Sequence, residues 1–319
     1  MRADTVAPRE LVGCAPPPSP QVPEMPPTHD PRALRDAFGA FMTGVTVVTA
    51  LDAQGRPIGF TANSFASVSL DPPLLLVCLA RSSRNLAAFT QGPGFAVNVL
   101  AEHQKDISNR FAQPVQDRFA GLAWRAGPHG APLIETVAAW FDCALERVVE
   151  AGDHVILLGR VQAFEHSAAN GLGYVRGSYF TPRLAEEATR TASAAPEARA
   201  VAIATREDQV LLFEDSQGQL RLPAFDIPQG EDATLASRLR EATELPVVVG
   251  FVYAVCGHGR ERRIVYRCEL GTGVATHGVF FAPEAIPLER IGDEEMRGIL
   301  QQYVGESALL PQLPTRQAD

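Results

Sequence analysis

The sequence predicts a mainly β domain followed by a smaller α+β domain, and three observations favour this fold class. The chain has 319 residues, which is about two domains at roughly 150 residues each. Residues 31–183 alternate short apolar runs with turn signals and contain few helical stretches, a pattern typical of a barrel or a sandwich. Residues 199–319 combine apolar strands with one clear helical stretch.

A proline-rich segment precedes the first domain. Residues 1–30 hold eight prolines and few large apolar side chains, so burial does not offset the entropy cost of ordering them. We therefore expect a disordered tail. At its end, Asp30 is suited to an N-cap and Pro31 to the first helical position, which predicts a helix with Leu34, Phe38 and Phe41 on one face.

Short apolar runs predict the strands of both domains. In the first domain they lie at 44–50, 59–70, 74–80, 94–100, 139–149 and 154–164, with helices expected at 84–90 and 102–111. Residues 184–198 are rich in Ala, Glu, Thr and Ser and predict a linker. In the second domain, strands are expected at 200–204, 210–214, 247–256 and 263–270, with a helix at 232–245.

Charge and composition exclude several classes of function. The net charge of −9 argues against general attraction to nucleic acid or to an anionic membrane surface. Lys105 is the only lysine among 28 basic residues, and its neighbours match no P-loop or Schiff-base site. We expect a solvated Lys105 side chain whose substitution matters little. Recognition of a phosphate group then falls to arginine.

Cysteine usage and hydropathy predict the compartment. The five cysteines are scattered and form no CxxC pair, which argues against a disulfide framework and against a zinc site. No apolar run reaches roughly 18 residues, and the N-terminus lacks the apolar core of a signal peptide. We therefore expect a cytoplasmic protein that binds no structural metal.

Small polar residues alternate along 61–69. On a single strand, Thr61, Asn63 and Ser67 would share one face, and Ala62 and Val68 the other. The polar face is either an ordinary solvated strand surface or a groove for a planar ring rich in heteroatoms. The residues alone leave both readings open.

Three further segments carry residues suited to a cofactor pocket. Arg81-Ser82-Ser83 follows a buried strand and precedes a predicted helix, an arrangement suited to phosphate. The alternative is that Ser83 only caps the helix. The turn at Gly152-Asp153-His154 fixes an imidazole at a strand start, where a histidine also serves structure alone. A glycine-rich segment brings Arg176 and Tyr179 across a pocket or forms a plain surface loop.

Together these residues resemble the flavin reductase-like family, whose members have an FMN-binding split β-barrel. The resemblance covers about residues 33–182. It rests on six ordered motifs, at 43–49, 61–69 with 71–73, 81–83, 95–100, the positions Gln104, Ser108 and Phe111, and 152–154. It implies a reductase component of a two-component flavin-dependent monooxygenase.

The resemblance also implies roles for particular residues. The isoalloxazine ring would be lined by Thr61, Ala62, Asn63, Ser64, Ser67 and Val68. The phosphate would be held by Arg81, Ser82 and Ser83, and Phe111 would form a wall. His154 would be catalytic, beside the ring face on which the nicotinamide stacks, with Arg176 and Tyr179 nearby. Asn98 and Gln104 would lie behind the site.

The implied reaction is hydride transfer from NADH or NADPH to FMN or FAD, in which the cofactors carry the electronics. The resemblance further implies a homodimer and a partner monooxygenase that receives the reduced flavin. Two alternatives stay open at this point. The protein retains its flavin and reduces another acceptor, such as a corrinoid or a metal complex, or it is a flavin-sensing or nucleotide-sensing regulator with vestigial activity.

The second domain contains a segment that resembles a degenerate Nudix box at 230–245. Arg240, Glu241 and Glu244 match that box, whereas Leu245 replaces its last glutamate. On a continuous helix Glu241 and Glu244 would share one face. The resemblance implies a module that binds an adenine-diphosphate compound and regulates the reductase, with Nudix hydrolysis crippled. A plain amphipathic helix is the alternative.

Overall fold

The computed structural model describes residues 30–115, 117–194, 197–227, 234–258 and 261–307. The expected disordered tail therefore lies outside the described residues, apart from Asp30. Helix α1 (Pro31–Gly39) forms where Asp30 and Pro31 predict a helix start, and it belongs almost entirely to a separate unit that ends at Phe38. Gly39 to Asp319 form one compact unit, which holds every other described element.

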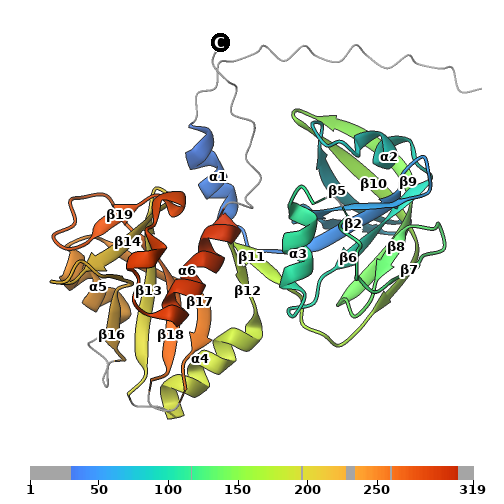
Figure 1. The fold of residues 1–319 in the computed structure, drawn as a ribbon. Helices are drawn as coiled ribbons and strands as arrows, with labels where there is room; N and C mark the ends of the chain where they lie inside the picture. Colours follow the sequence, from blue (N-terminus) through green and yellow to red (C-terminus); the bar gives the residue numbers. More distant parts are fainter. Residues whose placement is uncertain (1–29, 116, 195–196, 228–233, 259–260, 308–319) are drawn as a thin grey trace, which may run out of the picture. The chain divides into compact units, whose positions relative to one another are not determined.

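An antiparallel seven-stranded sheet builds the first half of this unit (Figure 1). Its strand order is β3-β2-β6-β9-β10-β5-β4. The bounds are β2 (Thr46–Leu51), β3 (Pro57–Ala62), β4 (Ala66–Leu70), β5 (Pro73–Ala80), β6 (Gly94–Val99), β9 (Ala139–Ala151) and β10 (His154–His166). The mainly β fold class is confirmed, because apolar side chains from these strands form one buried core.

Short elements complete this half. Two helices, α2 (Leu86–Gln91) and α3 (Lys105–Ala112), lie where helices were predicted. A two-stranded sheet pairs β7 (Trp124–Ala126) with β8 (Pro132–Ile134), and a three-stranded sheet has the order β1 (Thr43–Gly44), β11 (Gly173–Val175) and β12 (Ser178–Phe180).

The segment predicted as one strand at 59–70 is two strands. Strand β3 pairs with β2, and β4 pairs with β5, so the three residues between them join the two opposite edges of the sheet. The sheet curls to bring those edges together, and β3 packs against β5 without a ladder of backbone hydrogen bonds. The barrel is therefore split along this seam. Because the chain bends at Asn63, the alternation along 61–69 does not describe a single strand.

A mixed sheet builds the second half of the unit. Its order is β15-β14-β13-β18-β17, with β13 and β18 parallel. The strand bounds are β13 (Arg199–Arg206), β14 (Gln209–Glu214), β15 (Leu220–Arg221), β16 (Ala224–Asp226), β17 (Val247–Cys256), β18 (Arg263–Leu270) and β19 (Val279–Phe281). The helices are α5 (Leu235–Thr243) and α6 (Glu294–Ser307), with 3-10 turns at Pro283–Ala285 and Leu288–Arg290.

Alternating side chains of β13 place a helix on each face of this sheet. Val201 and Ile203 share a core with residues of α6, whereas Ala200 and Ala202 share another with residues of α5. This arrangement agrees with the α+β class expected for the second domain. The Nudix-like assignment stays a prediction, because much of its motif, residues 230–233, lies outside the described residues.

The segment 184–198, expected to be a linker, lies mostly in helix α4 (Pro182–Ala194), because Ala and Glu are strong helix formers and Ala188 and Thr191 are buried. Its role as a linker stays a prediction. The expectation that Glu241 and Glu244 share a helical face is wrong. Helix α5 ends at Thr243, and Glu244 is its C-cap in a left-handed conformation with φ 59°. Glu241 and Glu244 therefore do not share a helical face.

No helix in the described part of the chain is long and apolar enough to cross a membrane.

Candidate functional site

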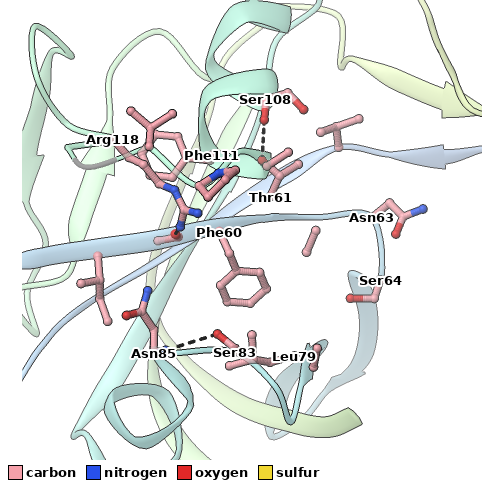
Figure 2. A pocket seen from close by; sticks show the side chains of 18 of the residues that line it. Phe60, Thr61, Asn63, Ser64, Leu79, Ser83, Asn85, Ser108, Phe111 and Arg118 are labelled. Carbon is pink, nitrogen blue, oxygen red and sulfur yellow. Dashed lines mark hydrogen bonds between the residues drawn. The ribbon is translucent and has the colours of Figure 1, made fainter. Parts of the chain in front are cut away.

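A cavity of about 1010 Å³ opens along the seam of the split barrel (Figure 2). Its walls come from β3, from the end of β5, from the loop between β5 and α2, and from α3. Beyond α3 they include residues 114, 115 and 117–119, and at the far end Tyr174, Tyr179 and Glu306. Elements distant in sequence thus meet at one hollow.

The split itself makes main-chain groups available in this cavity. Strand β3 pairs only with β2, and β5 from residue 77 onward pairs only with β10. Each strand therefore has one edge without a backbone ladder, and such edges present N–H and C=O groups. One of them is satisfied by a side chain, because the Cys78 N–H donates to Ser64 Oγ at 2.9 Å.

Aromatic side chains and a glycine shape the middle of the cavity. Figure 2 shows Phe60 between Arg118 on one side and Ser83 with Asn85 on the other. A Cβ at Gly59 would lie 2.9 Å from Phe111 Cε1 and 2.9 Å from the Val48 carbonyl oxygen, so only glycine lets Phe111 approach β3 this closely. Thr61 Oγ1 donates to the Ser108 carbonyl at 2.7 Å and fixes α3 against the same strand.

The structure brings most of the expected site residues to this cavity. Those that line it are Thr61, Ala62, Asn63, Ser64, Ser83, Phe111, His154 and Tyr179. They come from five separate segments, so their convergence is a property of the fold and not of one local motif. The expected residues outside the cavity walls are Ser67, Val68, Arg81, Ser82 and Arg176.

Each residue outside the walls has a structural reason to be there. Ser67 and Val68 lie on β4, beyond the bend at Asn63. Arg81 forms an ion pair with Glu150 of β9, which lies beyond β10 in the sheet, and Ser82 is exposed beside it. Arg176 pairs with Glu269, with Nη1 and Oε2 2.7 Å apart. The expected phosphate arginine is thus turned away from the cavity.

Arg118 is a cavity residue that the sequence did not indicate. Its Nη1 donates to the Gly59 carbonyl at 2.7 Å, and its Nε and Nη2 donate to the Gln113 carbonyl. Burial lowers the pKa of this guanidinium, and no carboxylate in the described part of the chain pairs with it. Ser83, Arg84 and Asn85 line the same cavity. No local pattern around Arg118 distinguishes it from a surface arginine.

His154 is held at the start of β10 by its own turn. Gly152 adopts φ 68°, and Asp153 Oδ1 lies 2.8 Å from His154 Nδ1. This hydrogen bond is the main reason that the pKa of Asp153 falls below its usual value. Because Nδ1 is engaged, Nε2 is the ring nitrogen left for a ligand.

Asn98 and Gln104, expected behind the site, brace the chain and do not line the cavity. Asn98 Nδ2 donates to the Val47 carbonyl at 3.1 Å, and its Oδ1 accepts from the Ile134 N–H. Gln104 Nε2 donates to the Glu135 carbonyl at 2.8 Å. Both side chains satisfy buried backbone groups, as buried amides usually do.

The expectation for Lys105 is wrong. Its side chain is 26% exposed and forms an ion pair with Glu306, whose side chain is 2% exposed. Glu306 lies on α6, about two hundred residues after Lys105 in the sequence, so no local sequence pattern predicts this ion pair. A carboxylate this deeply buried requires a charged or hydrogen-bonding partner, which explains why the only lysine is here.

The described part of the chain contains no cluster of three or more His, Cys, Asp or Glu side chains arranged to hold a metal ion. In the Nudix-like segment, Glu241 forms an ion pair with Arg238, with Oε2 and Nη1 3.8 Å apart.

A family model described as a flavin reductase like domain matches residues 38–183. A protein of Rhizobium meliloti (strain 1021) named a probable flavin reductase is 52% identical over 88% of this chain and 90% of its own length. The reductase component of a flavin-dependent trigonelline monooxygenase from Acinetobacter baylyi is 40% identical over 90% of this chain and 92% of its own length.

A crystal structure of a candidate oxidoreductase from Sinorhizobium meliloti 1021 is also similar. It is 50% identical in sequence, and the match covers 88% of this chain and 98% of that chain with a TM-score of 0.83. These matches extend well past residue 183, so they include the second domain. They confirm the resemblance on which the expected family rests.

The buried ion pair generates a stability prediction. Lys105→Met leaves the Glu306 carboxylate without its cation, so the free energy of unfolding should fall by roughly 3 kcal/mol, the lower end for breaking a buried pair. Arg160→Met breaks an exposed pair with Glu146 and should lower the free energy of unfolding far less, because solvent screens exposed pairs. Urea unfolding of both variants measures the difference, and equal losses would contradict a buried role for Lys105.

Proposed function

Because this chain belongs to the flavin reductase-like family, we propose that it transfers hydride from NAD(P)H to FMN or FAD and supplies the reduced flavin to a partner monooxygenase. The observation that carries the proposal is the cavity in the seam, where two strand edges without a ladder, aromatic walls and arginines meet. The bound flavin supplies the hydride acceptor and the nicotinamide supplies the donor.

The residues present fit a flavin. The ring system is planar with an apolar benzenoid end and a polar pyrimidine end, and the cavity offers Phe60 and Phe111 together with main-chain groups of β3 and β5. Phe111 packs directly on Gly59, where a Cβ would lie 2.9 Å from its ring, so the aromatic wall stands close to the main chain of β3. A lysine or cysteine nucleophile is not needed, since the protein supplies positioning and polar contacts.

Roles follow from where the side chains lie. Thr61, Ala62, Asn63 and Ser64 would hold the ring along β3 and the bend after it. Ser83, Arg84 and Arg118 would hold phosphate, since an arginine without a carboxylate partner is suited to bind one. His154 would orient the nicotinamide from the start of β10, with Nδ1 fixed by Asp153. Tyr179 would close the far end.

A homodimer is also part of the proposal. Apolar side chains are exposed near one end of the first sheet: Leu70 is 95% exposed and Phe164 is 66% exposed. Leu70 pairs with Pro73 and Leu74 with Arg160, so Leu70 of β4 and Phe164 of β10 lie toward the same end of the two strands that flank β5. Phe164 extends a row of rings that includes Phe141 and Phe65. Exposed apolar patches of this kind mark interfaces.

We place the protein in the cytoplasm. The support is that Cys78, Cys143, Cys256 and Cys268 are free thiols, which suits a reducing compartment.

Arg118→Gln tests the phosphate contact. The variant should weaken FMN binding roughly 10- to 100-fold, as expected for losing a charge-assisted hydrogen bond, and should weaken riboflavin binding far less. Arg81→Gln is the matched comparison, because that side chain points to Glu150 and should leave FMN binding unchanged. Fluorescence titration with both ligands measures this. An equal loss for FMN and riboflavin would show that Arg118 does not contact phosphate.

His154→Ala tests the hydride-transfer site. We expect anaerobic flavin reduction by NADH to slow by roughly 10- to 1000-fold, the range for losing one positioned polar group. His166→Ala, at the exposed far end of the same strand, should react like the wild type. Stopped-flow absorbance gives both rates, and a His154→Ala rate equal to the wild type would remove this residue from the reaction.

Sedimentation velocity tests the dimer. The wild type should sediment as twice the 34.3 kDa chain, and the double variant Leu70→Glu with Phe164→Glu should sediment as the monomer, because each glutamate would be desolvated in the interface. Val274→Glu changes an equally exposed apolar residue, 90% exposed in the second domain, and should stay dimeric. A monomeric wild type contradicts the proposal.

A further inference from the structure

The only lysine of the chain points its ammonium group into a ring of aromatic and acidic side chains. Lys105 Nζ lies 5.2 Å from the ring centroid of Tyr179 and 5.4 Å from that of Tyr253, both within the range of cation–π attraction. It also forms an ion pair with the buried carboxylate of Glu306. This is the chemistry by which proteins recognise alkylammonium ligands: aromatic faces plus one negative charge.

The walls of this ring are fixed by contacts that do not involve Lys105. Tyr253 Oη donates to Glu306 Oε2 at 3.1 Å, and Gln302 Nε2 donates to Glu306 Oε1 at 2.9 Å. Tyr179 Oη donates to Asn109 Oδ1 at 2.8 Å and lies 2.7 Å from Ser108 Oγ. The receptor groups are thus preorganised, which lowers the cost of binding a ligand.

Lys105 is the adjustable member of the group. Its ammonium sits on a flexible four-carbon chain, and the side chain is 26% exposed, so solvent is within reach. As the first residue of α3, its cation lies at the positive end of a helix dipole, where a positive charge is disfavoured. Nothing in the helix therefore holds it in place, and the ring of tyrosines and carboxylate supplies the attraction.

An entry path exists. Tyr179 and Glu306 line the cavity of about 1010 Å³ in the barrel seam, so a small molecule in that cavity reaches the group without crossing the core. Burial raises the pKa of Tyr179 to about 12, so its ring stays neutral at physiological pH and attracts cations only through its face.

We propose that Tyr179, Tyr253 and Glu306 form a binding site for a small alkylammonium cation, which displaces the ammonium of Lys105 toward solvent. In this structure Lys105 occupies its own receptor. The displacement is coupled to the flavin cavity, because Ser108 contacts Tyr179 on one side and accepts a hydrogen bond from Thr61 on the other. The site itself does not depend on flavin chemistry and is tested without flavin.

The tether sets the concentration at which displacement occurs. A group attached by a short flexible chain competes at an effective concentration in the millimolar range. A free cation with similar contacts must therefore be present at roughly millimolar concentration to take the site.

The wild-type chain provides a selective probe, since one lysine gives one side-chain signal. Protein labelled with ¹³C at lysine Cε is titrated with tetramethylammonium chloride, at constant ionic strength set by sodium chloride. We expect the Lys105 signal to start upfield of free lysine, because of the two tyrosine rings, and to move to the free position at roughly millimolar tetramethylammonium. A signal that starts at the free position, or does not move, overturns the proposal.

Charge and shape are separated by a matched pair of probes. Choline and 3,3-dimethylbutan-1-ol have the same shape, but only choline is a cation. Choline should move the Lys105 signal, and the neutral alcohol should not. Equal effects of the two, or an equal effect of added sodium chloride, would mean that the ring of side chains is not a cation receptor.

Two variants give the binding constants. Lys105→Met empties the receptor and should bind tetramethylammonium about tenfold or more tightly than the wild type by calorimetry, because the tethered competitor is gone. Glu306→Gln keeps the shape and removes the charge, and should bind it about tenfold or more weakly than the wild type. Reversed or equal affinities overturn the proposal, and the titration of the wild type decides the question if a variant does not fold.

Discussion

The missing ladder between β3 and β5 is the constraint on which the site depends. A closed barrel would satisfy every backbone group and fill its interior with side chains. Here one seam stays open, because β3 pairs only with β2 and the end of β5 pairs only with β10. Helix α3 and residues 114, 115 and 117–119 line the cavity at this seam, beside the two strand edges. Ser64, in the bend after β3, accepts from the Cys78 N–H of β5 and donates to the Cys78 carbonyl.

The second half of the unit contributes to that cavity through Glu306, a buried carboxylate. Glu306 of α6 reaches the far end of the cavity and pairs with Lys105, the first residue of α3. Helix α3 also carries Ser108 and Phe111, which line the cavity. A change at Glu306 therefore acts on the helix that covers the seam. Relatives that match about nine tenths of this chain share this two-domain length.

Much of the site was predictable, and the failures have physical causes. Short motifs singled out Thr61, Ser83 and His154, which line the cavity, since strand ends and turns are local features; their roles there stay predictions. Arg81 lies outside the cavity walls, because Glu150 of β9, a residue distant in sequence, is its ion-pair partner. Arg118 was missed because its position follows from three-dimensional contacts with Gly59 and Gln113.

The prediction of a solvated Lys105 side chain is wrong for a related reason. A lone polar residue near a helix start has a solvated side chain unless a distant charge meets it, and Glu306 lies far along the sequence. The helix within the segment 184–198 was not predicted, because the composition of this segment suits both an irregular linker and a helix. Burial of Ala188 and Thr191 decided for the helix, and burial by a tertiary partner is not readable from composition.

The most direct test of the account is anaerobic mixing of the full chain with free flavin and nicotinamide. Loss of the flavin's visible absorbance is followed after NADH or NADPH is added to the protein with FMN or FAD. The account predicts that one flavin is reduced for each nicotinamide oxidised, at a rate that saturates with flavin and far exceeds that of the mixture without protein. Reduction no faster than in the protein-free mixture, for both nicotinamides and both flavins, would contradict it.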